Sequence, residues 1–136
     1  MVTSREHIER TIDKLWVARN AGDPKGTVAG FADEGIFRMN AKGTGVEAMS
    51  KSIVGKSTVE QVVSQMMQVW QFEDWRKMDL VIDGERAVLH WRAMANCLAS
   101  GKCDEFDVYD FIKFKDGKIV EYVQSTDTAL MMKVAS

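Results

Sequence analysis

The feature that most constrains this chain is a pair of strand-like segments joined by a very short turn near the C-terminus. The segments are 105–114 and 118–126, and Asp116-Gly117 lies between them. An Asp-Gly pair between alternating apolar residues is a strong signal for a two-residue hairpin turn. The sequence therefore predicts two long antiparallel strands that share one curved sheet.

The first of these segments places a carboxylate in an apolar row. Side chains alternate between the two faces of a strand, so one face carries Val108, Asp110, Ile112 and Phe114, while Tyr109 and Phe111 lie on the other. An ionised Asp in such a row loses hydration, so we expect it to be paired, hydrogen-bonded or raised in pKa. Asp110 is therefore the leading candidate for a functional residue.

The N-terminal half has helical periodicity. A first helix is expected to begin at a capping box of Thr3 and Glu6 and to stop at Gly22, and a second, short helix to run from Pro24 to about residue 33. A short strand at 36–40 and a loop at 41–56, with a turn of helix near 46–50, follow. A third helix is expected from the capping box of Ser57 and Glu60 to about 72–74.

The C-terminal half is predicted to be sheet. Strands at 75–82, 86–98, 105–114 and 118–126 are separated by short turns, which is typical of an antiparallel meander. Helices followed by strands indicate an α+β domain, with three N-terminal helices packed on a strongly curved antiparallel sheet. With 136 residues and 46% hydrophobic content, we expect a single domain over 1–136.

Charge and composition weigh against several classes of partner. The net charge of −2, without clusters of Lys or Arg, predicts no binding to nucleic acid or to an anionic membrane. With no apolar leader or spanning run, a cytoplasmic protein is expected, in which Cys97 and Cys103 stay reduced. The two cysteines and two distant histidines do not have the spacing of a metal site, so no metal is expected.

Three segments resemble the nuclear transport factor 2-like superfamily. They are NAGD at 20–23, GFADEGIF at 30–37 and VYDFIKFKDGKI at 108–119. The superfamily includes ketosteroid isomerases and SnoaL-like polyketide cyclases, and the chain is most similar to that branch. The resemblance implies a cone-shaped α+β roll with a deep apolar pocket, and a homodimer through the outer sheet face. Exposed Tyr109 and Phe111 would fit such an interface.

The resemblance also assigns roles by position. Asp110 matches the protonated Asp that donates to the oxyanion in ketosteroid isomerases. The positions of their helix-one Tyr and general base hold Leu15 and Met39, which cannot move a proton, so steroid isomerisation is not expected. In SnoaL-like cyclases an Asp in the region of Asp110 is the acid/base. Epoxide hydrolases of this fold need an Arg two residues before a catalytic carboxylate, where this chain has Val108.

We predict Asp110 and Tyr122 as catalytic residues within an apolar cavity. The predicted pocket residues are Trp16, Phe31, Met39, Met66, Trp70, Trp91, Ala93, Ala95, Cys97, Val108, Ile112, Gln124 and Thr126. Each apolar member also fits a role as core filler, and Asp110 also fits a carboxylate that only accepts hydrogen bonds.

Two functions follow as hypotheses. The first is an isomerase, cyclase or lyase that acts on a small hydrophobic carbonyl compound by acid/base proton transfer, without a cofactor. The second is a non-catalytic module that binds a small hydrophobic molecule in the same pocket. A purely structural domain would follow if the cavity were packed solid.

Overall fold

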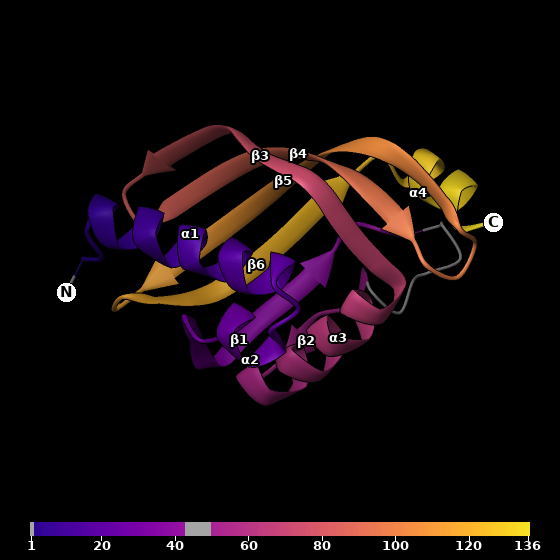
Figure 1. Ribbon diagram of the computed structural model, residues 1–136. Helices are drawn as coiled ribbons and strands as arrows, with labels where there is room; N and C mark the ends of the chain where they lie inside the picture. Colours follow the sequence, from indigo (N-terminus) through magenta and orange to yellow (C-terminus); the bar gives the residue numbers. More distant parts are fainter. Residues whose placement is uncertain (1, 43–49) are drawn as a thin grey trace.

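The computed structural model describes residues 2–42 and 50–136 and has the expected α+β order, shown in Figure 1. Helices precede most of the sheet, and one further helix ends the chain. The elements are α1 (Arg5–Asn20), α2 (Pro24–Thr27), β1 (Phe31–Met39), β2 (Ile53–Val54), α3 (Lys56–Val69), β3 (Trp70–Asp83), β4 (Arg86–Cys97), β5 (Lys102–Lys115), β6 (Lys118–Thr126) and α4 (Thr128–Ala135).

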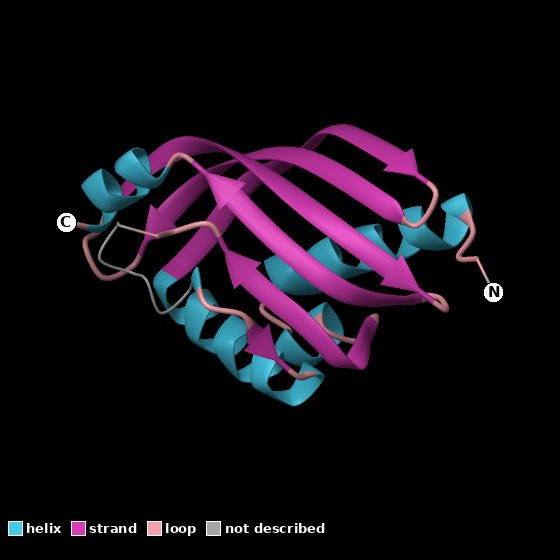
Figure 2. Ribbon diagram, turned by 180° about the vertical axis from the view of Figure 1, so that it is seen from behind, coloured by secondary structure: helices cyan, strands magenta, loops and turns pink. Residues whose placement is uncertain are grey.

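The strands form one six-stranded sheet in the order β2-β1-β6-β5-β4-β3. The predicted meander is confirmed, because β3, β4, β5 and β6 pair in sequence with antiparallel register. Two further strands extend the sheet beyond β6, because β1 pairs with β6 in parallel and β2 pairs with β1. The local sequence pattern did not predict these two pairings. The sheet is strongly bent, with helices on its inner side and an outer side formed by strands alone in Figure 2.

The start of α1 differs from the predicted capping box. Ser4 is the N-cap, and its side chain accepts a hydrogen bond from the His7 backbone N–H. Thr3 instead joins two hairpin turns: its hydroxyl donates to Glu85 and accepts from the Gly117 backbone N–H. The predicted cap was wrong because a long-range contact uses the threonine hydroxyl.

Two helix–strand boundaries also differ from prediction. The short helix ends at Thr27, and Phe31 already belongs to β1 rather than to a helix that reaches residue 33. Likewise α3 ends at Val69, and β3 begins at Trp70, which pairs with Cys97. In both places pairing with a distant strand overrides local helical periodicity. The helical turn expected near 46–50 falls mostly on residues 43–49, which lie outside the described residues.

The start of α3 lacks the predicted capping box. Its N-cap is Gly55, at φ 102°, and no side chain caps the first turn. The loop expected at 41–56 contains the short strand β2.

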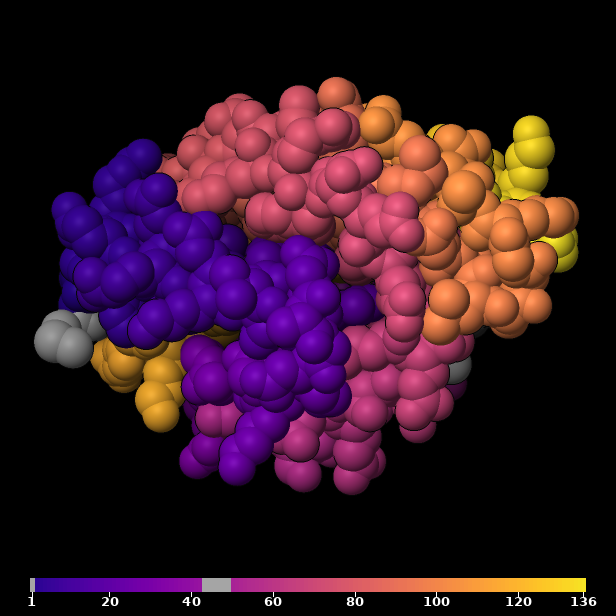
Figure 3. Space-filling view, viewed as in Figure 1, coloured from indigo at the N-terminus to yellow at the C-terminus, as the bar shows by residue number. Residues whose placement is uncertain are grey.

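The core lies between the helices and the inner face of the sheet. From α1, Ile8, Ile12, Leu15 and Trp16 are buried, and α3 contributes Val59 and Val63. The row Val108, Asp110, Ile112 and Phe114 is buried, while Tyr109 and Phe111 are exposed, as the alternation predicted. In the space-filling view α1 (indigo) and β3 (rose) meet over the interior (Figure 3).

Among the described residues, no helix has both the length and the apolar character needed to cross a membrane.

Gly35 is expected to be essential where β1 bends. The β1–β6 register shifts between Phe31 and Ile36, and a Cβ on Gly35 would lie 3.0 Å from the carbonyl oxygens of Ala32 and Ile119. Because backbone atoms cannot move aside cheaply, we expect Gly35→Ala to lower the free energy of unfolding by about 1–3 kcal/mol. Urea denaturation measures this. The exposed neighbour provides the control, since Glu34→Ala should change stability by less than about 0.5 kcal/mol, and equal stability of the two variants would contradict the account.

Candidate functional site

The interior contains two adjoining hollows between the helices and the sheet. Arg19, Met66, Phe72 and Gln124 border both. Each hollow has a cavity volume of about 50 Å³, which is room for a few waters. The other lining residues are Leu15, Trp16, Thr27, Val28, Phe31, Phe37, Val59, Val63 and Tyr122 in the first hollow, and Met39, Trp70, Trp91, Ala95, Phe106, Val108, Thr126 and Met131 in the second.

A wider hollow continues from the second one between α3 and α4. Its cavity volume is about 430 Å³. Met39, Met66, Trp70 and Met131 border both hollows. The narrow interior therefore continues into a wider apolar space past methionine side chains, which adapt their shape more readily than branched residues.

Asp110 lies directly behind the surface of the inner hollows. Its side chain is fully buried, and three side chains donate to its carboxyl group. Trp91 Nε1 lies 2.9 Å from Oδ2, Gln124 Nε2 lies 3.1 Å from Oδ1, and the Tyr122 hydroxyl donates to Oδ2. All three donors line a hollow, whereas Asp110 does not. The carboxyl group therefore orients three polar groups of the cavity wall.

Strand register explains why these groups meet. Asp110 on β5 is opposite Gln124 on β6, and its neighbour on the same face, Ile112, is opposite Tyr122. On the other side Val108 is opposite Trp91 of β4. Diagonal neighbours on one face of a sheet are within reach of long side chains, so three adjacent strands converge on one carboxyl group.

Burial shifts the pKa of both acidic groups in this cluster. It raises the pKa of Asp110 to about 6, although the hydrogen bonds from Tyr122, Gln124 and Trp91 act in the opposite direction. Burial, and then the charge of Asp110 and its hydrogen bond, raise the pKa of Tyr122 well above its usual value of 10.0. The Tyr122 hydroxyl therefore stays protonated, while Asp110 can gain or lose a proton near neutral pH.

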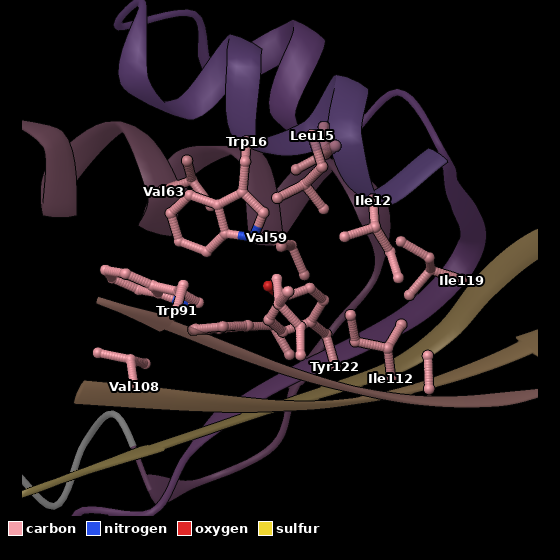
Figure 4. Close-up of a cluster of buried hydrophobic side chains, with 14 of the residues drawn as sticks. Ile12, Leu15, Trp16, Val59, Val63, Trp91, Val108, Ile112, Ile119 and Tyr122 are labelled. Carbon is pink, nitrogen blue, oxygen red and sulfur yellow. The ribbon is translucent and has the colours of Figure 1, made fainter. Parts of the chain in front are cut away.

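Trp16 supplies a polar group without a hydrogen-bond partner. Its indole Nε1 is buried and unpaired among the described residues, and its side chain lines the first hollow. It approaches the Tyr122 hydroxyl closely enough to oppose the rise in that group's pKa, but the geometry is not that of a hydrogen bond. Figure 4 shows Trp16 pointing from α1 toward Trp91 and Tyr122 on the sheet. Trp16 and Tyr122 thus face one part of the hollow with N–H and O–H groups.

Most of the predicted pocket residues line these hollows. They are Trp16, Phe31, Met39, Met66, Trp70, Trp91, Ala95, Val108, Tyr122, Gln124 and Thr126. Ala93, Cys97 and Ile112 are buried on the inner face but belong to the hydrophobic core rather than to the lining of either hollow.

Sequence reasoning missed several lining residues, of which Arg19 is the most polar. It is buried on α1 together with Leu15 and Trp16, and an arginine in that apolar row does not by itself suggest a role in a pocket. Phe72 was also missed, because residues 70–74 were assigned to the end of a helix, although they belong to β3. Among the described residues, no three His, Cys, Asp or Glu side chains gather closely enough to hold a metal ion.

Comparison with known proteins identifies the fold. The sequence model of the SnoaL-like domain matches residues 9–122. No curated protein sequence matches the chain. Among solved structures, a nuclear transport factor 2-like protein from Burkholderia xenovorans LB400 has a TM-score of 0.82 at 15% identity, covering 98% of this chain and 99% of that one.

Two further structures carry names that suggest enzymes. A candidate isomerase from Bacillus subtilis has a TM-score of 0.85 at 14% identity, and the match covers 96% of this chain and 95% of that one. A candidate polyketide cyclase from Xanthomonas campestris pv. campestris has a TM-score of 0.80 at 14% identity, covering 97% and 98%. At these identities the likeness establishes the shared fold and not the activity.

The raised pKa of Asp110 predicts a specific dependence of stability on pH. An unfolded Asp titrates near 3.9, whereas folded Asp110 titrates at about 6. Protonated Asp110 therefore contributes its full stabilisation below the pKa of the unfolded state, and this contribution is lost as the pH rises through the pKa of the folded state. Between pH 4 and 7 we expect the wild type to lose roughly 2 kcal/mol of unfolding free energy that Asp110→Asn does not lose.

Urea denaturation of both proteins across this range measures the difference. Subtracting the two curves removes the contributions of the other carboxyl groups. Parallel curves for the wild type and Asp110→Asn would contradict a raised pKa.

Proposed function

The chain belongs to the SnoaL-like domain family, and on that premise we propose that its interior binds a small hydrophobic carbonyl compound and transfers a proton to or from it. The reaction class is isomerase, cyclase or lyase, carried out by one SnoaL-like domain over residues 1–136. The observation that carries the proposal is the fully buried carboxyl group of Asp110, whose three donors all line the cavity.

We propose that Asp110 and Tyr122 act as one proton-donating unit. When Asp110 is protonated, its O–H donates to the Tyr122 oxygen, and the Tyr122 hydroxyl is then free to turn toward a ligand carbonyl. If the Tyr122 proton passes to a developing enolate oxygen, the Asp110 proton replaces it. A water molecule in the hollow takes the proton that leaves the α-carbon. The products are a neutral enol, a neutral Tyr122, an Asp110 carboxylate and a hydronium ion, so protons and charges balance.

The surrounding groups would stabilise this change of charge. Trp91 and Gln124 donate to Asp110, so they favour the carboxylate that the transfer leaves behind. The unpaired Nε1 of Trp16 provides a second donor toward the same carbonyl oxygen. Asp110 is then the proton reservoir, and Tyr122 is the group that contacts the ligand.

A non-catalytic binding module is the second candidate. It is favoured because none of the described residues that line the two inner hollows is an Asp, Glu or His. Abstraction of a proton from carbon needs a base within reach of that proton. Without one, the same donors would only orient a bound carbonyl compound.

Exchange of the α-protons of a ketone in D₂O distinguishes the proton-transfer enzyme from the binding module. With 4-phenylbutan-2-one as the probe, we expect the protein to accelerate exchange, with a rate that falls as the pH rises through about 6. Tyr122→Phe should reduce the acceleration about 10²–10⁴-fold. NMR measures the loss of the proton signals.

The second tyrosine of the chain provides a matched control. Tyr109 is exposed on the outer face, so Tyr109→Phe should exchange protons at the wild-type rate. Binding of the ketone without accelerated exchange would contradict the enzyme and support the binding module.

We also propose a homodimer through the outer face of the sheet. No described helix covers this face in Figure 2, and it exposes Tyr109 by 41% and Phe111 by 46%. The His90 ring stacks on Tyr109 with centroids 4.5 Å apart, and His90 Nε2 lies 2.7 Å from Asp107 Oδ1. An apolar patch with a polar, hydrogen-bonded border is typical of a protein–protein interface.

Sedimentation at micromolar concentration tests the dimer. We expect the wild type to sediment as a dimer and Phe111→Glu as a monomer, because the substitution buries an unpaired charge in the interface. Val17→Glu, on the exposed face of α1, should remain dimeric. A monomeric wild type would contradict this assignment.

A further inference from the structure

Arg19 is the one charged side chain among the described residues that line the mostly apolar inner hollows. It lies in the last turn of α1, is 7% exposed and borders both inner hollows. Its guanidinium carbon lies 4.7 Å from the centre of the Phe72 ring, and Nη2 donates to the Trp70 carbonyl oxygen at 3.1 Å. The cation is therefore held in place by β3 while it faces the cavity.

The described residues provide no counter-charge for this cation. No carboxylate of the described residues lies within ion-pair distance of Arg19, and none lines either inner hollow. Burial lowers the pKa of Arg19 to about 10, so the group is still protonated at neutral pH. A guanidinium has five N–H donors, and among residues 2–42 and 50–136 this one makes a single hydrogen bond.

An unpaired buried cation is costly, and proteins rarely keep one without a reason. The contacts with Phe72 and Trp70 use the face and one nitrogen of the guanidinium, and leave its other N–H groups without protein acceptors among the described residues. A guanidinium fork matches the geometry of a carboxylate and binds it through two parallel hydrogen bonds. We therefore expect the ligand to supply the carboxylate that accepts hydrogen bonds from Arg19.

The rest of the cavity limits what else that ligand contains. The hollows are narrow and lined mainly by aliphatic and aromatic side chains, and Trp16, Phe72 and Trp91 pack with ring centres 4.5 to 6.2 Å apart. A slender, planar and hydrophobic body fits such walls better than a bulky polar one.

We propose that Arg19 is the anion-binding residue of this pocket, and that the bound compound is a slender hydrophobic molecule carrying a carboxylate. The inference rests on the proposed function in one respect only, namely that the interior takes up a small molecule. It narrows the ligand class to small hydrophobic compounds that carry a carboxylate.

Two probes of equal skeleton test the proposal. They are trans-cinnamate, which is ionised at pH 7.5, and 4-phenylbut-3-en-2-one, in which a methyl ketone replaces the carboxylate. Calorimetric titration of the wild-type protein should give at least tenfold tighter binding of cinnamate. Arg19→Met keeps the length and apolar packing of the side chain but removes the charge, so it should lose this preference and bind the ketone as before.

Arg10→Met serves as the matched control. Arg10 is an exposed arginine on the same helix, so this variant should keep the wild-type preference for cinnamate. Equal affinity of the wild type for the two probes, or an unchanged preference in Arg19→Met, would overturn the anion site while binding of the ketone still supported the proposed function. If neither probe bound to the wild type, the anion site and the proposed function would both be overturned.

Thermal unfolding without ligand gives an independent test. If Arg19 awaits an anion, Arg19→Met should melt at the wild-type temperature or above it, because an apolar side chain replaces an isolated buried cation. If Arg19 instead serves to fasten α1 to β3, Arg19→Met should melt several degrees lower than Arg10→Met. That result would overturn the proposal.

Discussion

The structure of the interior depends on the convergence of three donors on the buried carboxyl group of Asp110. Trp91, Tyr122 and Gln124 reach it from the strands on either side. A shift of one residue in either pairing would turn a donor to the outer face and leave a buried carboxyl group without its partner. The cluster therefore specifies the register of β4, β5 and β6 and, at the same time, orients the polar groups of the cavity wall.

Three buried groups in the cavity wall or directly behind it depart from a satisfied hydrophobic core. Asp110 is desolvated, Nε1 of Trp16 has no partner among the described residues, and Arg19 has no described counter-charge. Each of these groups costs stability in the free protein. Proteins accept such local violations where a ligand completes the missing interactions. The position of the three groups around one narrow space is the strongest physical reason to regard it as a binding site.

The sequence predicted the C-terminal meander better than the N-terminal half. Asp116-Gly117 forms the expected turn, and β6 has the predicted bounds, 118–126. The inward position of Asp110 followed from simple alternation along a strand. The predictions failed where pairing with a strand distant in sequence determines the secondary structure. Phe31 belongs to β1 because β1 pairs with β6, and Trp70 belongs to β3 because it pairs with Cys97. Local patterns contain no information on such partners, and the same limit applied to Thr3, which is held by Glu85.

The candidate site was predictable as a row of residues but not as an arrangement. Alternation placed Tyr122 and Gln124 on the inner face, yet it did not reveal that Asp110 lies behind the cavity wall and that its donors form the wall. Arg19 recurs at helical spacing with Leu15 and Trp16, but the absence of a described counter-charge only emerges from three-dimensional packing.

The most direct test of the central claim is the pKa of Asp110 in the free protein, measured by NMR titration of its carboxyl carbon. A pKa near 6, well above the ~3.9 of an exposed Asp, would agree with a desolvated acid that exchanges a proton with Tyr122. A pKa at or below 3.9 would show that the three hydrogen bonds outweigh burial. It would contradict a role in proton transfer.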